Sequence, residues 1–286
     1  MRRWKNTNNA KNCHQTDIDY FKCFKIDNMY TIELQFTINN TQNLDSSGDI
    51  IESFLAALRM NGQILGKEWA LVYKDNRIIS YVFVPEADSL NRKYSNKYVS
   101  KYYNKLNALD INISQKMMGK QVFSAETCKC THIDSYILYT HFLSLESPLR
   151  CGNCFGTVPL YKILKTYDDE YYDIKCWETN YQCCDTLQMG CYVGERFGTR
   201  ELSNFKSKLT QNGLEICEKI KKLTGKNVYY YLYHYVSSPK KYIEQNRKCP
   251  SCGNEWLLDK RLFDIFDFKC DKCLLLSNIS SSLQKK

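Results

Sequence analysis

The first clear alternation of apolar and polar residues begins at Met29, beyond which Tyr30, Ile32, Leu34 and Phe36 share one face of a predicted strand. The preceding residues, 1–28, are polar, rich in asparagine and without sustained periodicity. Such a segment buries too little apolar surface to offset the entropy lost on ordering, so we predict a disordered leader. The abrupt change of pattern also suggests the hypothesis that translation starts at Met29 and not at Met1.

Residues 29–120 follow the order strand, helix, strand, strand, helix, strand. The first helix carries an apolar stripe and ends at Asn61-Gly62, a pair typical of helix termination. A hairpin is predicted next, with strands at 69–73 and 78–84. A second helix is predicted over 94–109, where apolar residues recur at helical spacing. This order predicts a ferredoxin-like α/β sandwich with two helices on one face of a sheet.

Residues 121–202 are rich in cysteine, and strand-like stretches such as 136–142 predict a mainly β region.

Residues 203–248 are predicted to form a helix and a strand. Ser203 is the expected N-cap of a basic amphipathic helix that ends at Thr224-Gly225. The following NVYYYLYHYV predicts a strand with four tyrosines on one face. These rings either pack against the helix or stack on unpaired bases. The chain is therefore predicted to be an α+β protein.

Length and cysteine content limit the class of protein. A chain of 286 residues has room for two or three modules and for a sizeable core. Its 15 cysteines would suit a secreted disulfide scaffold, but the chain begins MRRWKNTNNAKN, without an apolar signal segment. No stretch approaches the roughly 20 apolar residues of a membrane span. We therefore expect a cytoplasmic protein with reduced, metal-bound cysteines and no membrane partner.

The net charge of +9 is concentrated in the C-terminal third. From Ser203 to the end there are 16 lysines and arginines against 8 aspartates and glutamates, a net of +8, which leaves +1 for the first 202 residues. Such an excess favours nucleic acid through counterion release, or an acidic protein partner through electrostatic steering. A solvated basic face that keeps the protein soluble is the third interpretation.

Four cysteines near the C-terminus predict a metal site in residues 249–286. Two C-x-x-C turns, separated by seventeen residues, place sulfurs in pairs as a tetrahedral Zn²⁺ site requires. Apolar residues around 256–258 and 263–268 predict a hairpin between the turns, bridged at 259–261. This pattern predicts a zinc ribbon, with unrelated cysteine pairs or a disulfide staple as alternatives. The predicted ligands are Cys249, Cys252, Cys270 and Cys273.

A second zinc site is predicted in the middle region. Twenty residues separate a C-x-C pair from the C-x-x-C turn in LRCGNCFG, a loop similar in size to that of the first site. The predicted ligands are Cys128, Cys130, Cys151 and Cys154. In the alternative, Cys151 and Cys154 share a metal with two of Cys176, Cys183, Cys184 and Cys191. The remaining alternative is that no second metal binds.

Several segments together resemble a known bacterial family. They are ALRMNGQILGKEW, ESPLRCGNCFGTVPLYKI, CDTLQMGC, ERFGTRELS, GKNVYYYLYHY and CPSCGNEWLLDKRLFDIFDFKCDKCLLLSNI, and the likeness extends from about Met29 to Ile279. The family is of uncharacterised function and is described as zinc-ribbon-containing and nucleic-acid-binding. The resemblance implies a zinc ribbon at the four C-terminal cysteines and a cytoplasmic protein. Nucleic-acid binding is itself inferred in that family from the ribbon.

Binding is a better-supported hypothesis than catalysis. The expected phosphate contacts on or beside the ribbon are Lys248, Lys260, Arg261, Lys269 and Lys272. Arg196 and Arg200, in the glycine-rich GERFGTRE, are further candidates for anion contact. No catalytic residue is predicted, because four thiolates leave no open zinc position and the four histidines form no catalytic motif. Zinc removal is expected to unfold the last ~40 residues.

Overall fold

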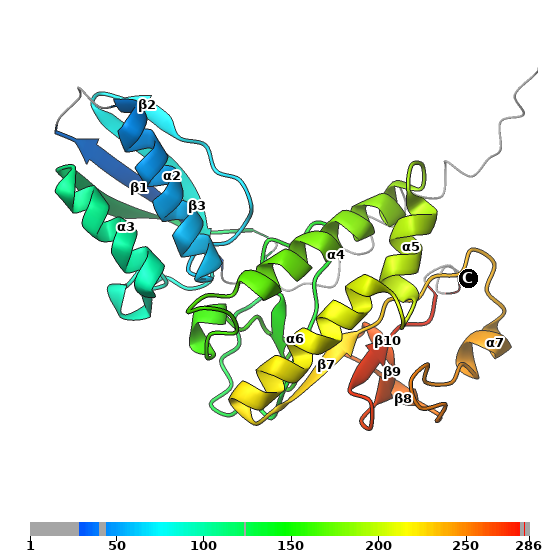
Figure 1. Cartoon of the computed structure of the whole chain (residues 1–286). Coiled ribbons are helices and arrows are strands. Elements are labelled where there is room, and N and C mark those ends of the chain that lie inside the picture. The colour runs from blue at the N-terminus through cyan, green and yellow to red at the C-terminus, as the bar shows by residue number, and fades with distance from the viewer. Residues whose placement is uncertain (1–28, 40–43, 123, 281–282, 284–286) are drawn as a thin grey trace, which may run out of the picture.

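The computed structural model describes residues 29–39, 44–122, 124–280 and 283, so the predicted leader lies outside the described residues. The described chain is a mixed α+β protein with two β-sheets. Each sheet has its own hydrophobic core, and helices cover both sheets (Figure 1). Among the described residues, no helix is both long and apolar enough to cross a membrane.

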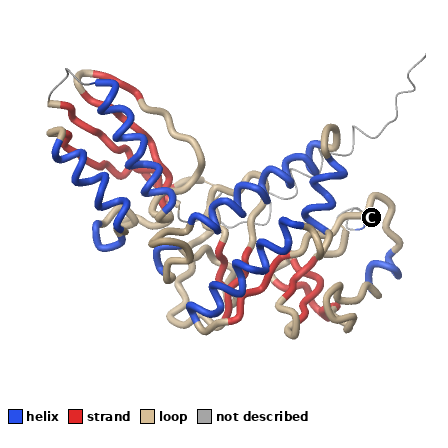
Figure 2. The backbone as a smooth tube through the Cα atoms, in the orientation of Figure 1, coloured by secondary structure: helices blue, strands red, loops and turns tan. Residues whose placement is uncertain are grey.

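The first sheet has four strands in the order β2-β3-β1-β4. β1 lies in the middle and pairs antiparallel with both β3 and β4. Two helices cover one face, which Figure 2 shows as a blue layer over the red strands. The order of elements along the chain is the predicted one: β1 (Tyr30–Ile38), α2 (Leu44–Met60), β2 (Val72–Lys74), β3 (Arg77–Val84), α3 (Lys97–Ala108) and β4 (Ile111–Lys120).

Local sequence explains the boundaries of these elements. α2 ends where Gly62 adopts a left-handed φ of 73°, as the Asn-Gly pair predicts. Asp75 and Asn76, with φ of 50° and 58°, form the tight turn between β2 and β3. α3 begins later than predicted because the Asn96 side chain caps it by accepting a hydrogen bond from Val99 N at 2.8 Å. A short 3-10 turn, η3 (Arg92–Tyr94), precedes that cap.

The second sheet has six strands in the order β6-β5-β7-β10-β9-β8. β5 and β10 both run parallel to β7, and the outer pairs are antiparallel. The two strands of the predicted ribbon hairpin, β8 and β9, thus extend the same sheet as the middle region. The strands are β5 (Ser135–Leu138), β6 (Leu149–Cys151), β7 (Asn227–Tyr231), β8 (Leu257–Leu262), β9 (Phe266–Cys270) and β10 (Leu275–Ser277).

The middle region was predicted to be mainly β, and this prediction is wrong. A 3-10 turn is followed by two helices, and α6 then packs on β7 (Figure 1). Residues buried at helical spacing along α4 include Ile174, Trp177 and Tyr181. Polar residues between them are buried as well, so the sequence shows no clean apolar stripe. These elements are η4 (Leu160–Lys162), α4 (Tyr172–Gly190), α5 (Glu195–Ser203), α6 (Lys208–Thr224) and the later α7 (Lys241–Gln245).

The basic helix begins at a different cap from the one predicted. Ser203 is the last residue of α5, whereas Ser207 caps α6 by accepting a hydrogen bond from Thr210 N at 3.1 Å. Gly225 ends α6 in the left-handed region, as predicted. The ribbon turn also differs: it lies at Phe263 and Asp264, with φ of 55° and 58°, and not at 259–261.

Residues 161–171, in the unit that contains the second sheet, hydrogen-bond to the unit that contains the first sheet. Asp169 accepts a hydrogen bond from Lys97 N at 2.8 Å and so caps the start of α3. The backbone N of Tyr171 donates to Met60 O at the end of α2 at 3.1 Å. Tyr161 adds a hydrogen bond to Glu86 at 2.9 Å. The two units are therefore joined by specific contacts at the ends of both helices of the first unit.

Candidate metal centres and basic surface

The four C-terminal cysteines predicted as ligands lie together in the structure. The sulfur atoms of Cys249, Cys252, Cys270 and Cys273 all lie within 4.8 Å of one another. Cys252 Sγ and Cys270 Sγ are 3.7 Å apart. In a tetrahedral site with Zn–S bonds of about 2.3 Å, the sulfurs are about 3.8 Å apart. This spacing fits four ligands of one metal ion and is too long for a disulfide bond of about 2.05 Å.

We call these four cysteines the ribbon group, and backbone hydrogen bonds in the turns position them. The first turn is closed by Gly253 N, which donates to Cys249 O at 2.9 Å, and Gly253 has a φ of 73° that favours glycine. The backbone N–H of Asn254 lowers the pKa of Cys252 to about 7. Burial raises the pKa of Cys270 to about 12. A buried set of four thiols becomes fully anionic only beside a compensating cation, which a metal ion supplies.

The second predicted group, the knuckle group, is also brought together. The sulfur atoms of Cys128, Cys130, Cys151 and Cys154 lie within 4.8 Å of one another. Backbone N–H groups of Asn153 and Gly156 point at sulfurs, with N to Sγ distances of 3.4 Å to Cys151 and Cys154 respectively. Such N–H donors stabilise negative charge on sulfur and orient metal ligands.

Two glycines shape the knuckle group. A Cβ on Gly156 would lie 2.9 Å from Cys128 Cα and 3.2 Å from Cys154 Sγ. A Cβ on Gly152 would lie 2.1 Å from the Ser135 hydroxyl oxygen. Only glycine therefore lets the two cysteine turns approach closely enough for four sulfurs to face one another. The donor set and the close packing both fit one metal ion of the thiolate-binding kind.

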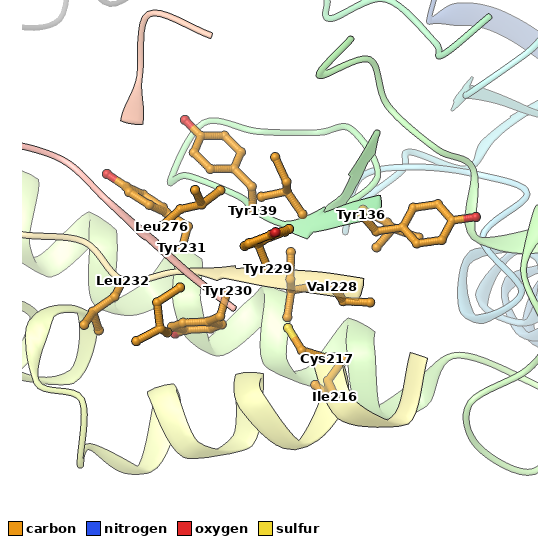
Figure 3. Close-up of a cluster of buried hydrophobic side chains, with 14 of the residues drawn as sticks. Tyr136, Tyr139, Ile216, Cys217, Val228, Tyr229, Tyr230, Tyr231, Leu232 and Leu276 are labelled. Carbon is orange, nitrogen blue, oxygen red and sulfur yellow. The ribbon is translucent and has the colours of Figure 1, made fainter. Parts of the chain in front are cut away.

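The alternative set of ligands for Cys151 and Cys154 does not form. Three of those cysteines lie on α4 and the fourth follows it, and none joins a metal-binding group within the described ranges. Cys217, on α6, is buried in the core beside β7, as Figure 3 shows. Cys13 and Cys23 lie outside the described residues. The two groups of four are therefore the places where the described chain could hold a metal ion.

An aromatic cluster connects the two groups. Phe155 directly follows Cys154, and its ring stacks on Phe263 of the ribbon turn with 5.1 Å between centroids and 22° between planes. Both Phe155 and Tyr139 also contact Phe266 of β9 edge to face. Because Phe263 sits at the turn between β8 and β9, its stacking on Phe155 ties the ribbon hairpin to the knuckle group. The two candidate metal centres thus share one packed structure.

The tyrosine-rich strand does not form a stacking platform for bases. Tyr229 and Tyr231 are buried in the core, and Tyr230 points to the helix side near Trp177. Figure 3 shows Tyr230 on the side of α6 and Tyr139 with Tyr231 on the opposite side of the sheet. The rings of Tyr229 and Tyr231 therefore pack in the core, but on the sheet face away from α6, the helix that was expected to cover them. Tyr233 and Tyr235, the other two tyrosines of the predicted face, follow the end of β7 and are half-buried.

Most of the predicted cationic contacts are already paired. Lys248 bonds Glu255 at 2.5 Å, Arg261 bonds Asp267 at 3.1 Å and Lys269 bonds Asp271 at 2.8 Å. Lys260 and Lys272 are exposed, and neither has a carboxylate partner in the described part of the chain. The exposed Lys248–Glu255 pair contributes little stability and opens readily to a stronger anion, whereas Asp267 is buried and holds Arg261 more firmly.

Sequence reasoning missed a buried polar network beside the knuckle group. Arg150 is 2% exposed and lies 3.5 Å from Glu146, which also accepts a hydrogen bond from Ser144 at 2.5 Å. Burial tends to raise the pKa of Glu146, but the Arg150 charge and hydrogen bonds lower it overall. Nearby on α4, burial raises the pKa of Asp185 to about 6, although its carboxylate accepts a hydrogen bond from Phe142 N that lowers it. Charged residues in a cysteine-rich segment gave no periodic signal that could have located this network.

Family comparisons cover nearly the whole described chain. Residues 29–119 match a domain of unknown function (DUF8589), 130–233 match another (DUF2310) and 239–283 match a third (DUF8594). One uncharacterized protein of Haemophilus influenzae is 34% identical over 258 residues, covering 88% of this chain and 98% of that protein. A second is 39% identical over 165 residues, covering 58% and 81%. No solved structure matches the chain.

Proposed function

The chain belongs to the family of the uncharacterized Haemophilus influenzae protein that it matches along most of its length, and we propose that it is a zinc protein that binds nucleic acid. Each group of four cysteines holds one Zn²⁺ in this proposal. The zinc is structural, because four thiolates leave no open position for water or substrate. The observation that carries the proposal is the two sets of four sulfurs, each within 4.8 Å.

We further propose that the chain has three parts. A ferredoxin-like domain spans 29–120, supported by the sheet order β2-β3-β1-β4 and by two helices between its strands. The knuckle group and its helices, with the basic helix, occupy 121–248, and the zinc ribbon occupies 249–286. The family boundary between 119 and 130 supports the first limit, whereas the boundary between 233 and 239 lies about ten residues ahead of 249. Reduced cysteines in metal sites support a cytoplasmic location.

Nucleic acid is the proposed ligand because of the charge near the ribbon. Lys240 and Lys241 are exposed at the start of α7, and Lys260 and Lys272 are exposed on the ribbon. This region belongs to the C-terminal third, which carries the net charge of +8. Lysines on rigid hairpins bind phosphates by counterion release and position a protein without reading sequence. The metal keeps the hairpin rigid, so these charges stay in a fixed arrangement.

The test compares two double variants of equal charge. Lys260→Ala with Lys272→Ala removes ribbon charges, and Lys67→Ala with Lys74→Ala removes two exposed lysines of the first unit. Binding to a labelled oligonucleotide is measured by fluorescence anisotropy between about 50 and 200 mM salt. The ribbon variant is expected to lower the salt slope by about 1.4–1.8, and the control is expected to match wild type. Equal losses in both variants, or no binding by wild type, would refute nucleic-acid binding by the ribbon.

An acidic protein partner is the second candidate function. One observation favours it: exposed apolar residues lie beside the same lysines, with Tyr242 77% and Ile243 60% exposed on α7. Large apolar side chains near positive charge are common in protein interfaces. A single stoichiometric partner, identified by mass spectrometry and retained after nuclease treatment and high salt, would favour this function over nucleic-acid binding.

A further inference from the structure

In the segment GERFGTRE, at the start of α5, the two glycines are needed for helix packing, whereas the other side chains are not. Gly198 of α5 packs against α4 so closely that a Cβ would lie 2.3 Å from Cys184 O. Gly194 adopts a φ of 77° and leads into α5 opposite Leu187. These two glycines let α4 and α5 form a tight helical hairpin. The packing turns the opposite side of α5 outward, and it gives no role to the side chains there.

Large side chains without a role in the core project from the tip of this hairpin. Tyr192 is 93% and Val193 72% exposed, and Phe197 is 50% exposed one turn into α5. Arg196 is exposed, and Arg200 lies with its guanidinium 5.5 Å from the Phe197 ring centroid. Ordering so many apolar and cationic side chains at a surface brings no folding benefit. The patch therefore fits a ligand better than a structural role.

The chemistry of the patch restricts its occupant. A second copy of the chain would bring together two patches of the same positive charge, which repulsion disfavours, whereas a polyanion complements both arginines. Glu201, the acidic residue next to Arg200, is mostly buried: it accepts a hydrogen bond from Leu209 N at 3.3 Å and pairs with the exposed Arg200 guanidinium at 3.4 Å, a contact that a phosphate can replace. The outward side is therefore cationic and aromatic. Flat rings beside arginines suit a polyanion with exposed flat bases, which only unpaired nucleic acid offers.

We infer that the tip of the α4–α5 hairpin binds single-stranded nucleic acid, with Tyr192 and Phe197 stacking on unpaired bases and Arg196 and Arg200 binding adjacent phosphates. This inference rests on the proposed nucleic-acid function and gives it a ligand class. The ribbon lysines bind phosphates of any strand. The aromatic tip adds a preference for unpaired strands, because bases in a duplex do not expose their faces.

The experiment measures binding of the full zinc-loaded chain to one sequence of about 20 nucleotides, as a single strand and as a duplex. The double variant Tyr192→Ala with Phe197→Ala removes both rings without changing the charge. It is expected to weaken single-strand binding about tenfold for each ring and to leave duplex binding unchanged. Tyr73→Ala, which removes an exposed tyrosine of the first unit, is the matched control and is expected to bind as wild type does.

A second variant tests the arginines through the salt dependence of binding. Arg196→Ala with Arg200→Ala is expected to lower the single-strand salt slope by about 1.4. Zinc content and circular dichroism show whether each variant is folded. If the ring variant binds single strands as wild type does, or loses duplex binding equally, the inference is wrong while the proposed function stands. If wild type binds no nucleic acid, the proposed function itself fails.

Discussion

If the ribbon group holds the proposed zinc ion, replacing one of its cysteines is expected to destabilise much more than the ribbon hairpin. Cys270→Ser removes a buried thiolate at the end of β9. Binding of a structural zinc contributes about 10–16 kcal/mol, whereas whole domains are stable by about 5–15 kcal/mol. The loss of one ligand therefore removes an energy comparable to the stability of the whole unit. The sequence alone predicted unfolding of only the last ~40 residues.

The loss of stability is expected to extend beyond the ribbon because the ribbon strands are part of the larger sheet. β10 pairs with β9 on one side and with β7 on the other, so the ribbon strands continue directly into the middle of the sheet. Leu275, Phe266 and Phe268 are fully buried and belong to the same core as α4 and α6. Burial of each such side chain contributes about 2 kcal/mol. If the ribbon strands detach, β7 and α6 lose part of their core.

Hydrogen exchange with mass spectrometry tests this propagation. Cys270→Ser is expected to lower protection in β7, β10 and α6 as well as in the ribbon, while the first sheet, which has its own core, keeps its protection. Cys183→Ser, at an exposed cysteine outside both metal groups, is the control and should exchange as wild type does. Full protection of β7 and α6 beside a rapidly exchanging ribbon would show that the two parts of the sheet unfold independently.

Four further substitutions have defined outcomes. Gly213→Ala places a Cβ 2.2 Å from the Tyr230 ring and should lower the free energy of unfolding by about 1–3 kcal/mol in denaturant titration, whereas Gly48→Ala meets nothing within 4 Å in α2 and should raise it by up to about 1 kcal/mol. Asp185 has a raised folded-state pKa of about 6, so its ionisation costs stability as pH rises from about 4 to 6. The free energy of unfolding of Asp185→Asn should therefore rise relative to that of wild type between about pH 4 and 6, to on the order of 3 kcal/mol above pH 6. A difference between the two proteins that does not change with pH would contradict this. Phe155→Ala removes the stacking between the two groups and should speed zinc release to a chromogenic chelator, and an unchanged rate would contradict the coupling.

The sequence predicted the cysteine groups well because their spacing is a local signal. Each group consists of two short turns, and a turn that offers two sulfurs needs only a few adjacent residues. The sequence also predicted the elements of the first unit, where Asn61-Gly62 and Asp75-Asn76 mark a helix end and a hairpin turn. In both cases, backbone geometry over a few residues determines the outcome.

The features that the sequence did not predict depend on long-range contacts. α4 is buried on several sides, so Lys175 and Glu178 pair with each other at 3.0 Å inside the protein and hide the helical period. The ribbon turn lies at Phe263, whose ring stacks on Phe155, a residue distant in sequence. The parallel pairing of β7 with β10 likewise has no local signature. Because the sequence gives no sign of this pairing, it predicts the ribbon as a separate module.

The central claim is that each group of four cysteines holds one zinc ion. Elemental analysis of the native, reduced protein by mass spectrometry measures zinc per chain directly. We expect two zinc ions per chain, falling to one when either group loses a cysteine, as in Cys154→Ser or Cys273→Ser, and staying at two in Cys183→Ser. Folded wild-type protein that contains no zinc, or a ratio unchanged by loss of a group, would contradict it.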